Sequence, residues 1–159
     1  MLYWDRPIIL ASASPRRKEM LAQLIDEYIV SPPTCDDGTF DCGTMTPKRW
    51  VHALAIMKAQ NVQQQCTLNE GTILSADTIC VLDGAIYGQP KDASEARKMI
   101  TSMIGRSHEV MTSWCLVSSD GSHLESGVEK TVVRLGELCG SILEDHLHAN
   151  EWVGRAGGY

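Results

Sequence analysis

Apolar and polar positions at the start of the chain predict a strand followed by a helix. Residues 7–11, PIILA, form a short apolar run that is typical of a buried strand. In residues 15–25, PRRKEMLAQLI, the apolar side chains recur at helical spacing. Residues 28–31 predict a second short strand, and residues 32–46 are rich in Pro, Gly, Asp and Thr, which is typical of a loop.

A longer helix is predicted from Pro47, with Thr46 as its N-cap. Apolar side chains fall on one stripe of this helix, at Val51, Leu54, Ala55 and Val62. Lys58 occupies the remaining position of the stripe. The pattern therefore places a charged residue where burial is expected.

The rest of the chain predicts two hairpins and two helices. Residues 72–88 contain two apolar runs around Asp77, and residues 108–135 predict two long strands; an Asp-Gly pair supplies the turn in each. Helices are predicted over residues 92–105, with capping-box spacing at the start, and over residues 141–152. Strands that alternate with helices, with hairpins among them, indicate an α/β protein with a mixed sheet.

Composition narrows the class of protein. A length of 159 residues predicts a single domain over residues 1–159, and 43% hydrophobic with 21% charged residues excludes a disordered chain. No window approaches 18 consecutive apolar residues, and Asp5 and Arg6 make the start a poor signal peptide. We therefore expect a cytoplasmic protein with no membrane partner. Six scattered cysteines without a C-x-x-C pair predict neither a zinc site nor a disulfide framework.

A net charge of −6 argues against a nucleic-acid partner but allows small anionic ligands, with a divalent metal adding positive charge. The start of the first helix, SPRRK at residues 14–18, is unusually cationic, which costs roughly 0.3–1 kcal/mol per charge unless an anion compensates. The hydroxyls of Ser12 and Ser14, the backbone N–H groups and the guanidiniums of Arg16 and Arg17 suit an oligophosphate. Alternatively, Ser14 only caps the helix and the arginines are solvated or pair with acids elsewhere.

Two charged residues fall in apolar surroundings. A buried Lys58 ammonium needs a partner, unless the side chain extends so that its head reaches water. Asp77 closes the apolar run ILSA, where a carboxylate must be hydrogen-bonded, paired or bound to metal. The alternative for Asp77 is a turn formed with Thr78 between two strands.

Further acids and histidines give weaker signals. Asp36 and Asp37 lie in the long polar loop, where paired carboxylates can help to hold Mg²⁺ or Mn²⁺ but are equally consistent with a solvated loop. His146 and His148 are two residues apart, which is the wrong spacing for one helical face, and His108 begins a strand. We therefore expect no zinc site and no Ser-His-Asp arrangement.

These motifs, in this order, resemble the Maf family of nucleoside triphosphate pyrophosphatases. The resemblance covers nearly the whole chain and is carried by LASASPRRKEML, the DD of PPTCDDG, ALAIMKA, SADTICVLDG, DASEARKMITSMIGRSHEVMTS and the terminal RAGGY. It implies an elongated mixed α/β sheet with flanking helices, arranged as two lobes around a cleft. This fold is shared with inosine triphosphate pyrophosphatases.

The resemblance also implies an activity: hydrolysis of a nucleoside triphosphate to the monophosphate and pyrophosphate with a divalent metal cation, Mg or Mn. Asp77 would accept the proton of the attacking water and hold metal with Asp37. Phosphates would be bound by Ser12, Arg16, Arg17 and Lys58. The combination of SPRR with ADT resembles the branch that acts on dTTP and UTP, so Thr78 and Arg16 bear on the choice of base.

The chain departs from the family pattern in two places. Gln89, between Gly88 and Pro90, stands where the family usually has a phosphate-binding lysine. The sequence stops at Tyr159, before a glutamine-glycine motif and further strands, so we expect a single Maf-like domain without the usual C-terminal segment. The alternative function is a catalytically impaired, nucleotide-binding or septum-regulating protein. The oligomeric state is open, with a homodimer as one alternative.

Overall fold

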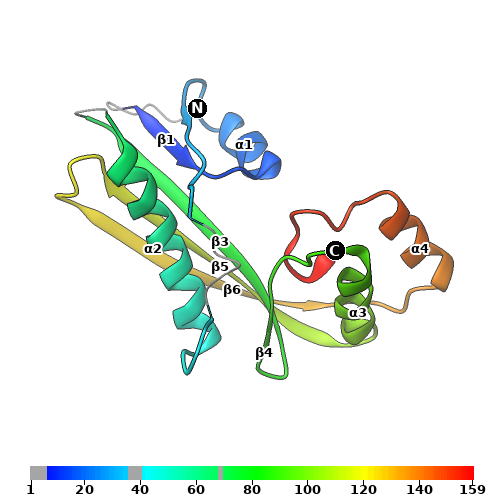
Figure 1. Ribbon diagram of the computed structural model, residues 1–159. Coiled ribbons are helices and arrows are strands. Elements are labelled where there is room, and N and C mark those ends of the chain that lie inside the picture. Colours follow the sequence, from blue (N-terminus) through cyan, green and yellow to red (C-terminus); the bar gives the residue numbers. More distant parts are fainter. Residues whose placement is uncertain (1–6, 36–40, 68–69) are drawn as a thin grey trace. The chain divides into compact units, whose positions relative to one another are not determined.

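A computed structural model describes residues 7–35, 41–67 and 70–159. Figure 1 shows the order of the helices and strands along the chain. Their bounds are β1 Ile8–Ala11, α1 Pro15–Ala22, β2 Ile29–Val30, α2 Pro47–Gln65, β3 Thr72–Leu82, β4 Ala85–Tyr87, α3 Ala93–Met103, β5 Ser107–Ser118, β6 Leu124–Arg134, α4 Gly140–His148 and the 3₁₀ turn η2 Ala156–Gly158.

The strands form one mixed sheet. Its order is β2-β1-β3-β5-β6, and β4 pairs with β3 off this path. β1 is parallel to both neighbours, with Ile9 opposite Ile29 on one side and Ile73 on the other. β4 is antiparallel to β3 and returns through the predicted Asp-Gly turn. The expected α/β class with a mixed sheet and flanking helices is confirmed.

Contacts divide the chain into two units, which we describe separately. Unit 1 contains residues 1–77 and 113–128, and unit 2 contains residues 78–112 and 129–159. Strands β3, β5 and β6 contribute residues to both units. None of the helices in the described part of the chain combines the length and apolar character that a membrane crossing requires.

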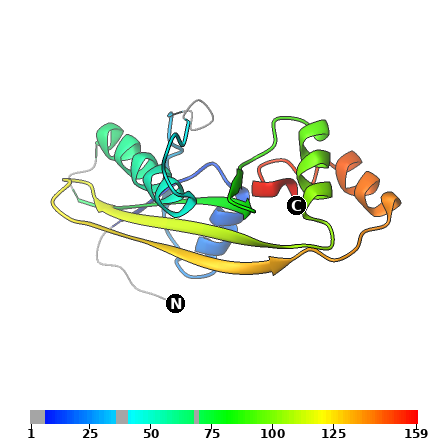
Figure 2. The ribbon, with the colours of Figure 1, turned by 90° about the horizontal axis from the view of Figure 1, so that it is seen from below.

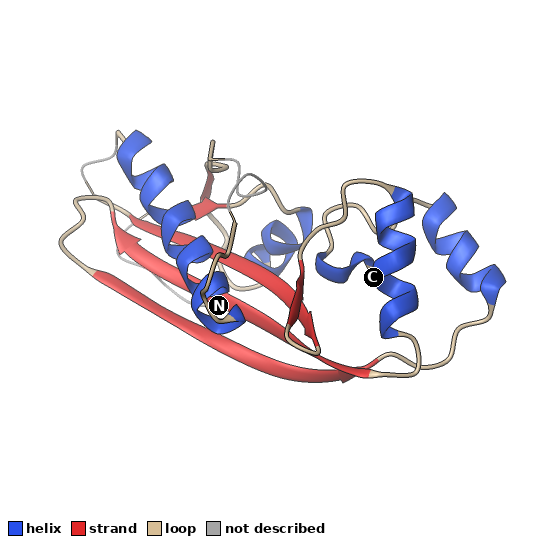
Figure 3. Ribbon diagram, turned by 60° about the horizontal axis from the view of Figure 1, so that its bottom comes forward, coloured by secondary structure: helices blue, strands red, loops and turns tan. Residues whose placement is uncertain are grey.

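In unit 1, alternate side chains of the strands face different helices, because successive residues of a strand point to opposite faces. Ile9 and Ile73 pack with Ala55 and other residues of α2, which lies along the strands in Figure 3. Ile8 and Leu10 instead pack with Leu21 of α1. The two helices therefore cover opposite faces of the sheet, and the parallel strands β1 and β3 are buried on both sides.

In unit 2, α3 and α4 lie side by side (Figure 2). Their contact is apolar and includes Ala96, Ile100, Leu143 and Leu147. The C-terminal residues pack against α3 and β3, and the hydroxyl of Tyr159 shares a hydrogen bond with Nε2 of His108 on β5. Burial lowers the pKa of His108, which favours its neutral ring.

Gly157→Ala is expected to lower the free energy of unfolding by about 2 kcal/mol, measured by urea denaturation. Gly157 has φ +73°, and a Cβ atom there would lie 2.9 Å from Sγ of Cys80 and 3.1 Å from Cε of Met103. Gly154→Ala is the matched control, because Gly154 has φ +71° but a Cβ atom there would meet nothing within 4 Å. Equal losses in both variants would contradict a packing role for Gly157.

Two helices are shorter in the structure than the apolar spacing predicts. The spacing extends the first helix through Ile25, but α1 ends at Ala22, and Met20 and Leu24 are 65% and 50% exposed. The last helix is predicted to reach residue 152, but α4 ends at His148, and Asn150 has φ +54°. A residue in the left-handed region ends a helix, so the residues that follow Asn150 do not continue α4 even though their spacing fits a helix.

Candidate functional site

The candidate site lies in unit 1, just past the paired segment of β1 and β3. Ala11 is opposite Ser75 in the parallel register, so Ser12 follows the last paired residue of β1 directly and Asp77 lies two residues beyond Ser75 on β3. The carboxyl end of a parallel strand is where α/β proteins commonly bind ligands, and here β1 ends while β3 continues to Leu82. Sequence alone predicted these two residues as candidates, and the register brings both of them near the end of β1.

Ser12 and Ser14 shape the turn into α1. Ser12 is only 4% exposed, and its Oγ accepts a hydrogen bond of 3.1 Å from the backbone N–H of Ser14. Ser14 occupies the N-cap position, but its own side chain makes no capping hydrogen bond. Ser14 therefore begins α1 where the sequence predicts, but without a hydrogen bond from its hydroxyl to the helix.

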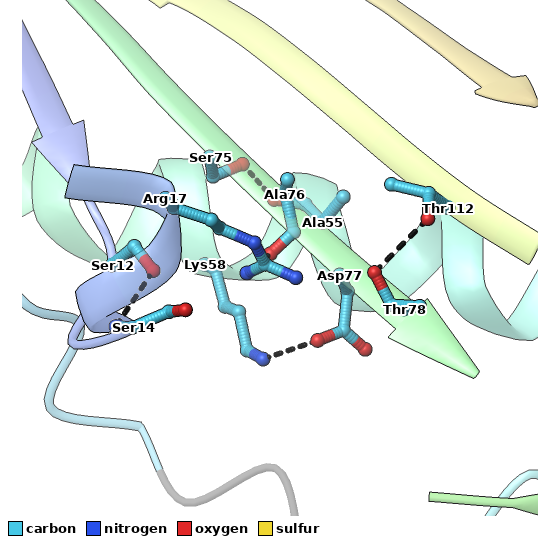
Figure 4. A network of polar contacts seen from close by, with 10 residues as sticks. All are labelled: Ser12, Ser14, Arg17, Ala55, Lys58, Ser75, Ala76, Asp77, Thr78 and Thr112. Atoms are coloured by element: carbon cyan, nitrogen blue, oxygen red, sulfur yellow. Dashed lines mark hydrogen bonds and ion pairs between the residues drawn. The ribbon is translucent and has the colours of Figure 1, made fainter. Parts of the chain in front are cut away.

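The cations of α1 differ in their surroundings. Nη1 of Arg17 donates a hydrogen bond of 2.5 Å to the backbone carbonyl of Ala76, the residue before Asp77. Figure 4 shows the Arg17 guanidinium beside Ala76. Arg16 is exposed on the first turn of α1. Arg17 is therefore directed at the sheet edge, and the alternative that it is solvated is wrong.

Lys58 and Asp77 form a buried ion pair. Nζ of Lys58 donates to Oδ1 of Asp77 at 2.6 Å, and the two residues are 9% and 6% exposed. β3 runs without interruption from Thr72 to Leu82, so the predicted alternative of a turn at Asp77-Thr78 is wrong. The alternative that the Lys58 head reaches water is also wrong. The pair compensates two charges that neither residue could carry alone at this depth.

Other candidate residues are placed less centrally or not described. Thr78 is in unit 2, and its hydroxyl hydrogen-bonds to that of Thr112 at 3.0 Å. Gln89 is exposed after β4, also in unit 2. Asp36 and Asp37 lie outside the described residues. The described part of unit 1 thus brings together Ser12, Ser14, Arg17, Lys58 and Asp77.

The donor set fits a metal ion that arrives with a phosphate ligand. Within the described residues no three His, Cys, Asp or Glu side chains gather around one point. At the site, Asp77 supplies a hard carboxylate oxygen, while its Oδ1 is engaged by Lys58. Mg²⁺ usually keeps several waters and is held by one or two carboxylates together with substrate phosphates, and Asp77 is a ligand of that kind.

Sequence reasoning missed Ser75. This residue is fully buried, and its Oγ donates a hydrogen bond of 2.6 Å to the backbone carbonyl of Ala55 in α2. The available signal was a serine inside the apolar run ILSA, two residues before Asp77 and so on the same face of the strand.

Fold and site together define an α/β protein in which a cation-bearing helix and a buried lysine–aspartate pair meet at one edge of a mixed sheet. The family model described as Maf-like protein matches residues 7–159. The chain therefore belongs to the Maf family, as the sequence motifs predicted.

Curated relatives agree with this family. A protein of Pyrococcus furiosus is 38% identical over 154 residues, which cover 97% of this chain and 77% of the relative. Relatives from Halalkalibacterium halodurans and Ruminiclostridium cellulolyticum are 40% and 34% identical over 154 residues, covering 97% of this chain and 78% of each. All three are named dTTP/UTP pyrophosphatase.

Proposed function

We propose that this chain is a nucleoside triphosphate pyrophosphatase, a hydrolase that converts dTTP and UTP to the nucleoside monophosphate and pyrophosphate. Membership of the Maf family and the names of the relatives support this activity. The structural observation that carries it is the buried Lys58–Asp77 pair, at the sheet edge to which α1 directs Arg17. A carboxylate placed beside bound phosphates is available to accept the proton of an attacking water.

The triphosphate would bind where α1 begins. Backbone N–H groups of the first turn, the Ser12 and Ser14 region and the guanidiniums of Arg16 and Arg17 provide positive charge and donors for phosphate oxygens. Hydrolysis of phosphate anhydrides depends mainly on positioning and on neutralising charge. These residues would therefore do most of the catalytic work by holding the substrate.

Asp77 would act as the general base. A water oxygen attacks phosphorus, its proton passes to the Asp77 carboxylate, and the anhydride bond between the α and β phosphates breaks to release pyrophosphate. Lys58 donates to Oδ1 and so favours the ionised form of Asp77 that can accept the proton. Proton transfer by a placed base contributes about 10²–10⁴-fold to a rate.

The proposed cofactor is a divalent cation, Mg²⁺ or Mn²⁺, which when bound would neutralise negative charge on the phosphate oxygens. Asp77 would hold it together with Asp37, which lies outside the described residues. Thr78 and Arg16 would bear on the choice of base, and Gln89 would contribute an amide in place of a cation. The proposed cellular location is the cytoplasm.

Release of pyrophosphate from a panel of nucleoside triphosphates tests the proposal. We expect dTTP and UTP to give the monophosphate and pyrophosphate with Mg²⁺ or Mn²⁺, and ATP and GTP to react more slowly. Chelation of the metal is expected to stop the reaction, and added metal to restore it. Stepwise release of inorganic phosphate, or no turnover of any nucleotide, would contradict the proposal.

A further inference from the structure

The hydroxyl of Ser75 joins β3 to the backbone of α2. Ser75 is fully buried, and it donates to the carbonyl oxygen of Ala55 at 2.6 Å (Figure 4). In the middle of a helix that carbonyl already accepts the backbone N–H of Ala59, four residues later. The helix therefore does not need Ser75 to satisfy its hydrogen bonds, and the contact serves to fix α2 on the strand.

This contact lies next to the Lys58–Asp77 pair. Ala55 and Lys58 are three residues apart and so share a face of α2, while Ser75 and Asp77 are two residues apart and share a face of β3. Both contacts thus join the same short part of the helix to the same short part of the strand. Ser75 holds a backbone atom of α2, so it fixes the helix itself, whereas Lys58 reaches Asp77 through a long side chain with several rotatable bonds.

We propose that Ser75 is a positioning residue. It holds α2 at the position along β3 where Nζ of Lys58 meets Oδ1 of Asp77. The inference rests on the pyrophosphatase function proposed above, in which Asp77 accepts the proton of the attacking water. Without the Ser75 hydroxyl, the position of Lys58 relative to Asp77 becomes variable. The chemical step suffers, while phosphate binding by the start of α1 is kept.

Kinetics of Ser75→Ala test the proposal. We expect kcat for pyrophosphate release to fall about tenfold with KM changed less than about twofold, since a misplacement of 1 Å can cost about 10²-fold. The matched control is Ser126→Ala, because Oγ of Ser126 on β6 also bonds to α2, through Nε2 of His52 at 2.8 Å. That bond holds a side chain rather than the helix backbone, so both constants should stay within about twofold of the wild type.

A second measurement does not depend on turnover. The rate at which an amine-acylating reagent modifies Lys58 is measured by mass spectrometry, well below the unfolding temperature of each variant. We expect Ser75→Ala to raise the labelling rate of Lys58 several-fold, to leave that of the exposed Lys48 unchanged, and Ser126→Ala to change neither. If Ser75→Ala does not fold, Ser75→Cys keeps the volume and a weaker donor, and the same direction is expected.

Three results would overturn the positioning role: equal losses of kcat in the two serine variants, a change confined to KM, or unchanged labelling of Lys58 in Ser75→Ala. If the wild-type protein releases no pyrophosphate, the proposed function fails. The labelling experiment still decides whether Ser75 places Lys58, so the two failures are distinguishable.

Discussion

Asp77→Asn is expected to lower kcat for pyrophosphate release about 10³-fold, because the amide has nearly the shape of the carboxylate but cannot accept the proton of the attacking water. The substitution leaves the phosphate-binding groups of α1 in place, and KM for dTTP should change far less than kcat. Steady-state kinetics with purified wild-type and variant protein, at saturating Mg²⁺, measure both constants. A loss confined to kcat identifies a group that acts in the transition state.

Asp26→Asn is the matched control for this experiment. Asp26 is also in unit 1, but it is exposed in the connection after α1 and has no place in the proposed site. The same chemical change there should leave both constants unaltered. Turnover by Asp77→Asn close to that of the wild type would remove Asp77 from the role of base, and with it the mechanism proposed above.

Local patterns were sufficient for most elements of the fold. The helix that begins at Pro47, the hairpin between β3 and β4, and the N-cap of α3 all follow from signals within a few residues of one another. In α3, for example, Asp92 accepts a hydrogen bond of 2.8 Å from the backbone N–H of Glu95. Helix ends were predicted less well, because apolar spacing continues past Ala22 and His148 although the helices do not.

The sequence predicted residues of the candidate site one at a time, but not which of them contact each other. The apolar stripe around Lys58 and the apolar run before Asp77 each indicated a buried charge that needs a partner. Whether Lys58 and Asp77 pair with each other depends on how α2 packs on β3. The spacing of residues along the chain does not specify that packing. The bond from Arg17 to the carbonyl of Ala76 is of the same kind, since a backbone acceptor 59 residues away leaves no mark in the sequence.

Lys58→Met is expected to lower the free energy of unfolding by about 3 kcal/mol at pH 8, measured by urea denaturation. Removing one partner of a buried ion pair leaves the other charge uncompensated, which typically costs about 3–5 kcal/mol. Lys130→Met is the control, because Lys130 pairs with Glu109 at 2.7 Å but both side chains are substantially exposed, and such pairs contribute little. Equal destabilisation of the two variants would show that the buried Lys58–Asp77 pair contributes no more to stability than the exposed Lys130–Glu109 pair.

A double variant separates charge compensation from packing. Lys58→Met combined with Asp77→Asn removes both charges and keeps similar side-chain volumes, so it should be more stable than Lys58→Met alone by at least about 1 kcal/mol. Its turnover should nevertheless remain as low as that of Asp77→Asn, because the base is absent. Additive losses of stability would show that the two charges are not coupled. Recovered stability without recovered activity is the outcome expected of a pair whose aspartate performs the proton transfer and whose lysine keeps that carboxylate charged.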